Sequence, residues 1–177
     1  AGWPEVPDPG AGAGLALATN FGNMHAGEQL LGTRAAGPEA PSLDRLLAAY
    51  EFQTTAAALA RLWSLPGPAT VLSLSCAAGT AVIGYAWEQI RAGHSRAMVV
   101  GAYDALSRFC WSGLCALRTM TKGTLRPFDR TRNGTIFGEG AAALVLEELD
   151  FARRRGAPLL AEVKGFGSSN NAFHMTA

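Results

Sequence analysis

Cys76 is the residue of this chain whose surroundings best suit chemistry. It follows a short apolar run, Val71 to Ser75, and precedes the small residues Ala77, Ala78 and Gly79. The apolar run predicts a strand, and the residues after it predict a tight turn and then a helix from Ala77 to about Arg91. The unpaired N–H groups and the dipole at the start of a helix favour thiolate over thiol, and the thiolate is the nucleophile. Cys76 is therefore a candidate nucleophile that a thioester carbonyl could approach closely.

A structural role for Cys76 stays open on local sequence alone. Free cysteine is among the most buried residue types, and a junction between a strand and a helix is an ordinary place for it. Cys110 and Cys115 fall within a helix expected over Leu106–Met120, and we interpret both as core or half-buried residues.

Charged residues near motif-like loops offer weaker candidates. Arg126, Asp129 and Glu139 lie in or next to a polar loop expected over Thr121–Gly140, and we expect them to pin loops around the site rather than react. His25 and Glu28 are three residues apart and would share a solvated helix face. His94 would lie about 20 Å from the Cys76 sulfur, at ~1.5 Å per helical residue, and so could not serve as its base.

Composition limits the class of protein. The chain has 177 residues, enough for one domain, and 15 basic side chains against 14 acidic ones. This balance gives no support to nucleic acid as a partner. Three cysteines without metal-ligand spacing favour a reducing compartment, and neither a signal peptide nor an apolar run of about 18 residues is present. We expect a cytoplasmic protein that binds no membrane, no metal and no cofactor.

The elements that must position Cys76 form an alternating pattern of strands and helices. This pattern predicts an α/β fold with one mixed sheet covered by helices, in which a right-handed crossover makes neighbouring strands parallel. Ser42 is expected to cap a helix that reaches about Leu65 and is broken once or twice. Loops are expected at residues 1–13 and at Gly32–Pro41. The expected strands are Leu15–Thr19, Ala69–Ser75, Ala97–Asp104, Ala141–Leu146 and Leu159–Gly165, and a last helix is expected at Glu147–Arg155.

Six segments, taken together, resemble the β-ketoacyl-acyl-carrier-protein synthases, the condensing enzymes with the thiolase fold. They occur in the family's order and span roughly residues 15 to 177. The segments are Gly67-Pro68, Ser75-Cys76-Ala77-Ala78-Gly79 with Ile83-Gly84, Gly101-Ala-Tyr-Asp-Ala105, Arg126-Pro-Phe-Asp129, Gly138-Glu-Gly-Ala141 leading into Leu144-Val-Leu-Glu147, and Asn171-Ala-Phe-His-Met-Thr176. Each segment alone is a weak signal, but six in register are specific; the Arg126 and Gly138 segments argue against a thiolase proper.

The resemblance implies a role for Cys76. The matching cysteine of the family takes an acyl group from a phosphopantetheine thioester, and the carbanion of a decarboxylated malonyl thioester then attacks that acyl group. Cys76 would be nucleophile and acyl carrier, and its own N–H would be one donor of the oxyanion hole. The family's chain-length subunits lack this cysteine, so its presence favours a catalytic subunit. The helix expected after Ala105 would line part of the acyl pocket through Leu106, Trp111 and Cys115, where Trp111 is large for a position that is often small.

The same resemblance makes residues 1–177 a partial N-terminal domain, without the family's first strand and second half. The two histidines and the lysine that drive decarboxylation come from that second half, and none of His25, His94 and His174 matches them. We therefore carry two hypotheses. One is an enzyme that condenses acyl groups with malonyl-acyl-carrier-protein as a homodimer paired through the strand at Ala69–Ser75. The alternative is a truncated or split non-catalytic chain that pairs with another condensing-enzyme subunit.

Overall fold

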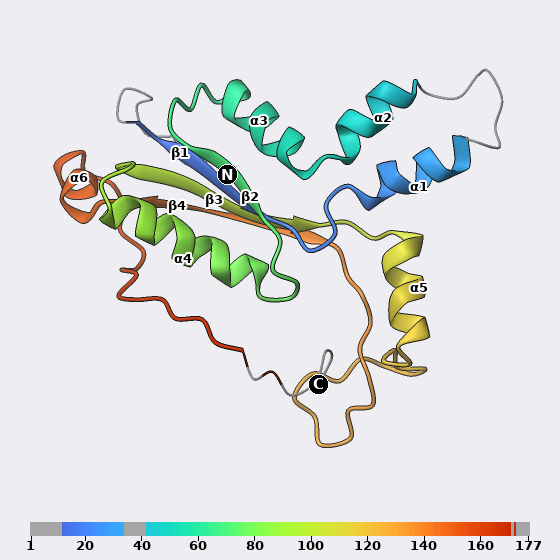
Figure 1. Ribbon diagram of the computed structural model, residues 1–177. Coiled ribbons are helices and arrows are strands. Elements are labelled where there is room, and N and C mark those ends of the chain that lie inside the picture. Colours follow the sequence, from blue (N-terminus) through green and yellow to red (C-terminus); the bar gives the residue numbers. More distant parts are fainter. Residues whose placement is uncertain (1–11, 34–41, 171, 173–177) are drawn as a thin grey trace.

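A four-stranded sheet lies at the centre of the chain in the computed structural model, which describes residues 12–33, 42–170 and 172 (Figure 1). The strand order is β2-β1-β3-β4; β1 is parallel to both β2 and β3, and β4 is antiparallel to β3. The predicted mixed sheet is thus confirmed. The strands are β1 Gly14–Ala18, β2 Ala69–Leu72, β3 Ala97–Asp104 and β4 Gly140–Glu147.

The central strand β1 is buried on both faces. Leu15 and Leu17 pack into one hydrophobic cluster, and Ala16 and Ala18 pack into a second cluster on the opposite face. Successive side chains of a strand point to opposite faces, so a strand that is apolar at every position can fill two cores at once. This explains why a continuous apolar run, rather than an alternating one, forms the middle of the sheet.

Helices cover the two faces of the sheet. Helix α3, Phe52–Leu62, contributes Ala56 and Leu59 to the cluster around Leu15, whereas helix α4, Ala78–Arg91, contributes Val82 and Ala86 to the cluster around Ala16. In Figure 1 these helices lie on opposite sides of the strands. The long helix predicted from Ser42 is two helices, α2 Leu43–Tyr50 and α3, with one break at Glu51.

The remaining helices lie at the periphery. Helix α5 is two residues later at its start and four residues shorter at its end than predicted, because Arg118 adopts a positive φ of 56° that ends the helical path. Helix α6 lies within the predicted range and carries Arg153 and Arg154 in its last turn, where positive charge suits the dipole. The three helices are α1 Met24–Thr33, α5 Arg108–Ala116 and α6 Leu149–Arg154.

Two predictions about the C-terminal third are wrong. The strand predicted at Leu159–Gly165 is an exposed segment without strand pairing, which runs beside α4 and places Phe166 against Gly84 (Figure 1). The strand predicted at Ala141–Leu146 exists as β4, but its first five residues are exposed rather than buried. Apolar composition identified extended chain correctly in both places, but it could not show which neighbours would pair with it or cover it.

Several predictions lie outside the described residues. They concern most of the loop at 1–13, most of the loop at Gly32–Pro41, and the segment Asn171–Thr176 apart from Ala172, which includes His174. Within the described ranges, no helix has the length and apolar character needed to cross a membrane.

Candidate active site

Cys76 lies in the short connection between β2 and α4, two residues before the first helical residue, Ala78. The predicted position at the start of the helix is confirmed. The thiol is free and the residue is exposed, so the alternative of a core cysteine is wrong for this chain. An exposed thiol at a helix start is accessible to an electrophile, which a core thiol is not.

The backbone before Cys76 makes a sharp bend. Ser75 has a φ of 50°, in the left-handed region that residues other than glycine rarely adopt. Two hydrogen bonds close the bend: the Ala77 N–H donates to the Leu74 carbonyl at 3.2 Å, and the Ala78 N–H donates to the Ser75 carbonyl at 3.1 Å. A strained residue of this kind persists only where its surroundings fix it, and such residues cluster at functional sites. The bend turns the chain from the sheet into the helix and leaves Cys76 on its outside.

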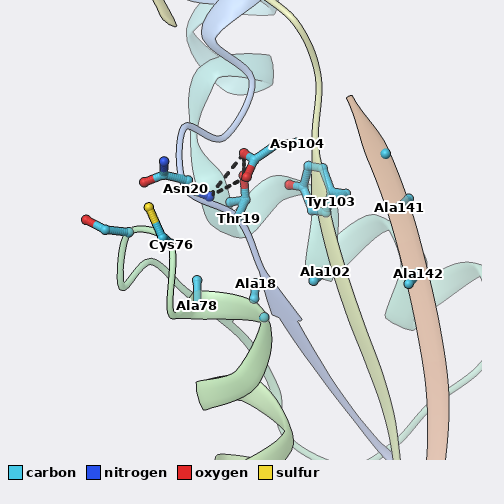
Figure 2. Close-up of a pocket in the computed structure, with 13 residues that line it drawn as sticks. Ala18, Thr19, Asn20, Cys76, Ala78, Ala102, Tyr103, Asp104, Ala141 and Ala142 are labelled. Atoms are coloured by element: carbon cyan, nitrogen blue, oxygen red, sulfur yellow. Dashed lines mark hydrogen bonds between the residues drawn. The ribbon is translucent and has the colours of Figure 1, made fainter. Parts of the chain in front are cut away.

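A cavity of about 440 Å³ opens beside Cys76. It forms where the carboxyl ends of β1 and β3, the start of β4 and the first turn of α4 meet (Figure 2). Most of its lining residues have small side chains, so space remains next to the sulfur. The lining residues are Ala18, Thr19, Asn20, Ser75, Cys76, Ala78, Gly79, Ala102, Tyr103, Asp104, Gly140, Ala141 and Ala142.

One carboxylate, that of Asp104, is held firmly in the wall of this cavity. It accepts hydrogen bonds from the Thr19 hydroxyl at 2.7 Å, from the Asn20 N–H at 3.0 Å and from the Phe21 N–H at 3.1 Å. Figure 2 shows Asn20 between the Asp104 carboxylate and Cys76. Hydrogen bonds to an ionised acceptor are stronger than those between neutral groups, so this carboxylate fixes the end of β1.

Sequence reasoning missed Thr19, Asn20 and Asp104 as members of the site. A signal was present, because Thr19 and Asp104 end two predicted strands, and the carboxyl ends of parallel strands meet at one edge of a sheet, where ligands bind. What the sequence did not reveal was that β1 lies directly beside β3.

The residues predicted to line an acyl pocket lie elsewhere. Leu106, Trp111 and Cys115 are exposed, and the set of described residues around the cavity at Cys76 contains none of them. The expected burial of Cys110 is confirmed, whereas that of Cys115 is wrong: its sulfur is exposed and lies 3.3 Å from that of Met120. The acyl-pocket role of the three residues stays a prediction.

The charged candidates hold loops, although none of the three lines the cavity at Cys76. Arg126 donates to the Thr131 hydroxyl at 3.0 Å, and both the N–H and the hydroxyl of Thr131 donate to the Asp129 carboxylate, at 2.6 and 2.7 Å. These two bonds from Thr131, the side-chain bond first, hold the pKa of Asp129 below its usual value. Glu139 accepts a hydrogen bond from the Leu106 N–H at 3.2 Å, which ties the loop before β4 to the loop after β3.

Neither His25 nor His94 lines the cavity at Cys76. His25 lies 3.8 Å from Glu28 on an exposed face of α1, as expected, but Glu28 also accepts a hydrogen bond of 2.7 Å from the Phe109 N–H and so joins α1 to α5. His94 follows the far end of α4 and bonds to Gln89 at 3.1 Å. Across the part of the chain that is described, no group of three or more histidine, cysteine or acidic side chains could hold a metal ion.

Comparisons with known proteins agree on one family. Residues 1–152 match the model of the family "Beta-ketoacyl synthase, N-terminal domain". The ketoacyl synthase alpha subunit of the tetracenomycin polyketide synthase of Streptomyces glaucescens is 45% identical over 117 residues, which is 62% of this chain and 28% of that protein. The 3-oxoacyl-[acyl-carrier-protein] synthase 2 of Staphylococcus aureus is 36% identical over 117 residues, 63% of this chain and 29% of that protein.

Solved structures show the same likeness. A β-ketoacyl synthase from Burkholderia phymatum superposes with a TM-score of 0.79 at 32% identity, over 95% of this chain and 43% of that one. A ketosynthase solved with its acyl-carrier protein, from the AntDE:AntF system, superposes with a TM-score of 0.85 at 29% identity, over 94% of this chain and 44% of that one. This chain therefore spans less than half the length of these relatives.

Proposed function

The chain belongs to the β-ketoacyl synthase family, whose N-terminal domain it matches. We therefore propose that it functions as an acyltransferase, which condenses an acyl group held on Cys76 with malonyl-acyl-carrier-protein. The product is a 3-oxoacyl-acyl-carrier-protein, as in fatty-acid or polyketide synthesis. The observation that carries the proposal is the exposed Cys76 at the start of α4, beside a cavity with small-residue walls.

The reaction has two steps that share one sulfur atom. The Cys76 thiolate attacks the carbonyl of an acyl thioester; a new carbon–sulfur bond forms, the carbon–sulfur bond to the carrier breaks, and the carrier leaves as a thiolate that takes a proton from water. A malonyl thioester then loses carbon dioxide, and the electron pair of the broken carbon–carbon bond attacks the acyl carbonyl on Cys76. The carbon–sulfur bond to Cys76 breaks, and the thiolate is restored. The Cys76 N–H would stabilise the negative oxygen that forms in each attack.

The decarboxylation requires groups beyond Cys76. The family resemblance assigns it to two histidines and a lysine of the second half, and we assign no part in it to His25 or His94. Residues 1–177 would then act as a nucleophile-bearing N-terminal domain. No step of the proposal uses a metal or a cofactor.

The partners follow from the same proposal. An acyl carrier protein would deliver the thioesters, in line with the relative solved in complex with its acyl-carrier protein. Two further relatives were solved as ketosynthases with a chain length factor, at TM-scores of 0.83 and 0.68. We propose a homodimer or a heterodimer of this kind, formed through β2, which lies at one edge of the sheet. We place the protein in the cytoplasm, where its three unpaired cysteines would stay reduced.

The acyl pocket is a further part of the proposal. Leu106, Trp111 and Cys115 would line it, and the bulk of Trp111 would shorten it and favour short acyl chains. A Trp111→Gly variant of a complete, active assembly should accept longer chains. An unchanged chain-length preference would leave Trp111 as an ordinary surface or packing residue.

A second candidate function is favoured by exposed apolar side chains. Phe109 and Trp111 of α5 are each more than half exposed, and Leu144 of β4 is 48% exposed. Large apolar side chains left exposed are candidates for surfaces that another protein covers. The chain would then be non-catalytic by itself and would pair with another subunit of the ketosynthase type.

One experiment separates the two candidates. The chain is incubated with acyl- and malonyl-loaded carrier protein, and intact mass and released carbon dioxide are measured for the native chain, Cys76→Ala and Cys115→Ala. Cys115 is the matched control, because it is the other exposed thiol. We expect acylation of the native chain and of Cys115→Ala but not of Cys76→Ala. Release of carbon dioxide would show a complete enzyme, and acylation without release would show a competent nucleophile in an incomplete one. If Cys76 is never acylated, the non-catalytic candidate is favoured.

A further inference from the structure

The turn between β1 and α1, residues 19–22, contacts three further segments near the cavity. Its Asn20 carbonyl accepts a hydrogen bond of 3.2 Å from the hydroxyl of Ser73, three residues before Cys76. Its Phe21 ring meets the Phe137 ring edge to face, with centroids 5.6 Å apart. The Thr19 N–H donates to the Leu72 carbonyl at 3.1 Å. The turn therefore connects the end of β2, the segment that leads to Cys76, and the long loop before β4.

The shape of this turn depends on Asp104. Thr19 is 1% exposed, and its hydroxyl donates to Asp104 at 2.7 Å while accepting from the Gly22 N–H at 2.8 Å. The N–H groups of Asn20 and Phe21 point at the same carboxylate. Two successive N–H groups and a buried hydroxyl converge only when the backbone curls around the acceptor, so removing its charge weakens the whole turn.

The contacts of Asp104 leave it little capacity for chemistry of its own. A carboxylate offers about four acceptor positions. One Asp104 oxygen accepts from Thr19, Asn20 and Phe21, and the other also receives the Asn20 N–H. A general base needs a free acceptor atom aimed at its substrate, whereas the acceptor positions of Asp104 are used by hydrogen bonds from the turn.

We propose that Asp104 is a positioning residue: through the turn at 19–22 and the bond from Ser73 to Asn20, it holds the segment that presents Cys76 to the cavity. This inference rests on the proposed function, because orienting Cys76 matters for activity only if Cys76 is the nucleophile. It gives a residue in the cavity wall a role in orienting the nucleophile.

The chain itself supplies controls for a test. Asp129 also receives a threonine hydroxyl and a backbone N–H, but in a loop that does not line the cavity. Cys115 is exposed, so its alkylation reports general changes in the protein. The experiment treats the full chain with iodoacetamide and follows alkylation of Cys76 and Cys115 separately by peptide mass spectrometry.

In Asp104→Asn we expect the Cys76 rate, relative to Cys115, to fall at least about fivefold, the scale of one lost hydrogen bond. In Asp129→Asn the ratio should stay within about twofold of the native value. An unchanged ratio, a rise at Cys76 or an equal change at both thiols in Asp104→Asn would overturn the proposal.

Ser73→Ala provides a second variant that leaves every Asp104 contact in place. It should lower the alkylation rate of Cys76 but not that of Cys115. In the Asp104→Asn background it should lower the Cys76 rate little further, because both substitutions interrupt the same chain of hydrogen bonds from Asp104 to Ser73. Full additivity would show that Asp104 does not act through Ser73 and would overturn the proposed route. Alkylation needs no carrier protein, so this result is independent of the acylation experiment: a chain that carrier protein never acylates can still show the Asp104 effect, and the reverse also holds.

Discussion

Strands β1 and β4 belong to one sheet and are both apolar, yet their surroundings are opposite. β1, with the sequence Gly-Leu-Ala-Leu-Ala, is buried at every residue, whereas the first five residues of β4, with the sequence Gly-Ala-Ala-Ala-Leu-Val-Leu-Glu, are exposed. β1 has a strand on each side and helix-supported clusters on both faces, whereas β4 pairs with β3 at the edge of the described sheet. The difference shows that apolar sequence predicts a strand, and that neighbours decide its burial.

The contrast extends to the two parts of the chain that these strands represent. Before Ala105 the leucines of β1 and the valines of β3 are buried; after it, Phe109 is 59% exposed and Phe128 is fully exposed. The nucleophile belongs to the first part, but the wall of its cavity is partly formed by β4 of the second part. Four experiments, in order of decreasing effect, test this contrast.

The largest effect should come from matched leucines. Leu15→Ala removes a side chain that is completely buried, so it should lower the free energy of unfolding by about 2–5 kcal/mol. Leu160→Ala removes one that is 94% exposed and should change it by less than about 0.5 kcal/mol. Urea denaturation followed by circular dichroism measures both. Similar losses in the two variants would contradict the division into a packed and an uncovered part.

A medium effect is expected where the exposed C-terminal segment touches the packed part. A Cβ at Gly84 would lie 2.3 Å from the Phe166 ring, so Gly84→Ala should displace the ring and lower the free energy of unfolding by about 1–2 kcal/mol. In a Phe166→Ala background the clash is gone, and the same substitution should stabilise the chain by up to about 1 kcal/mol, because alanine favours a helix. The same sign in both backgrounds would mean that Phe166 does not dock on α4.

A smaller effect should separate two serines at helix starts. The Ser107 hydroxyl accepts a hydrogen bond of 3.2 Å from the Cys110 N–H, so Ser107→Ala should cost about 1 kcal/mol. Ser42 precedes α2 without a side-chain capping bond to the described residues, and Ser42→Ala should cost less than about 0.5 kcal/mol. Thermal unfolding compares the two. A loss at Ser42 as large as at Ser107 would contradict the capping geometry.

The smallest effect concerns Asp129 in the exposed loop. Its folded pKa lies below the usual value of 3.8 because Thr131 bonds to the carboxylate. Its contribution to stability is therefore present above the unfolded pKa and is lost as the pH falls through the lower folded pKa. A side-chain NMR titration should show a midpoint below 3.8, and Thr131→Val should move it upward. If the Asp129 midpoint is the same in Thr131→Val, the Thr131 hydroxyl is not the cause of the lowered pKa.

The sequence predicted most where local pattern decides the structure. Residues 97–104 formed a strand over the predicted range, because an uninterrupted apolar run has few other ways to bury itself, and Cys76 was placed correctly at the start of a helix. Long-range pairing decided the rest. The segment at Leu159–Gly165, predicted as a strand, pairs with no strand among the residues that the structure describes. The role of Asp104 depends on β1 lying beside β3, which the order of elements does not reveal.

The register of the central strand also constrains how the chain can fold. Gly14 pairs with Met98, so roughly 80 further residues must be synthesised after β1 before its second neighbouring strand, β3, exists. At a synthesis rate of about 5–20 residues per second, this interval lasts about 4–16 s. During that time an apolar strand has at least one edge without a partner, and such edges pair readily with other chains. The pairing of β1 with β3, which later holds Asp104 against Thr19, therefore leaves β1 unprotected while the chain is being synthesised. A chaperone that covers β1 would protect the chain best during this interval.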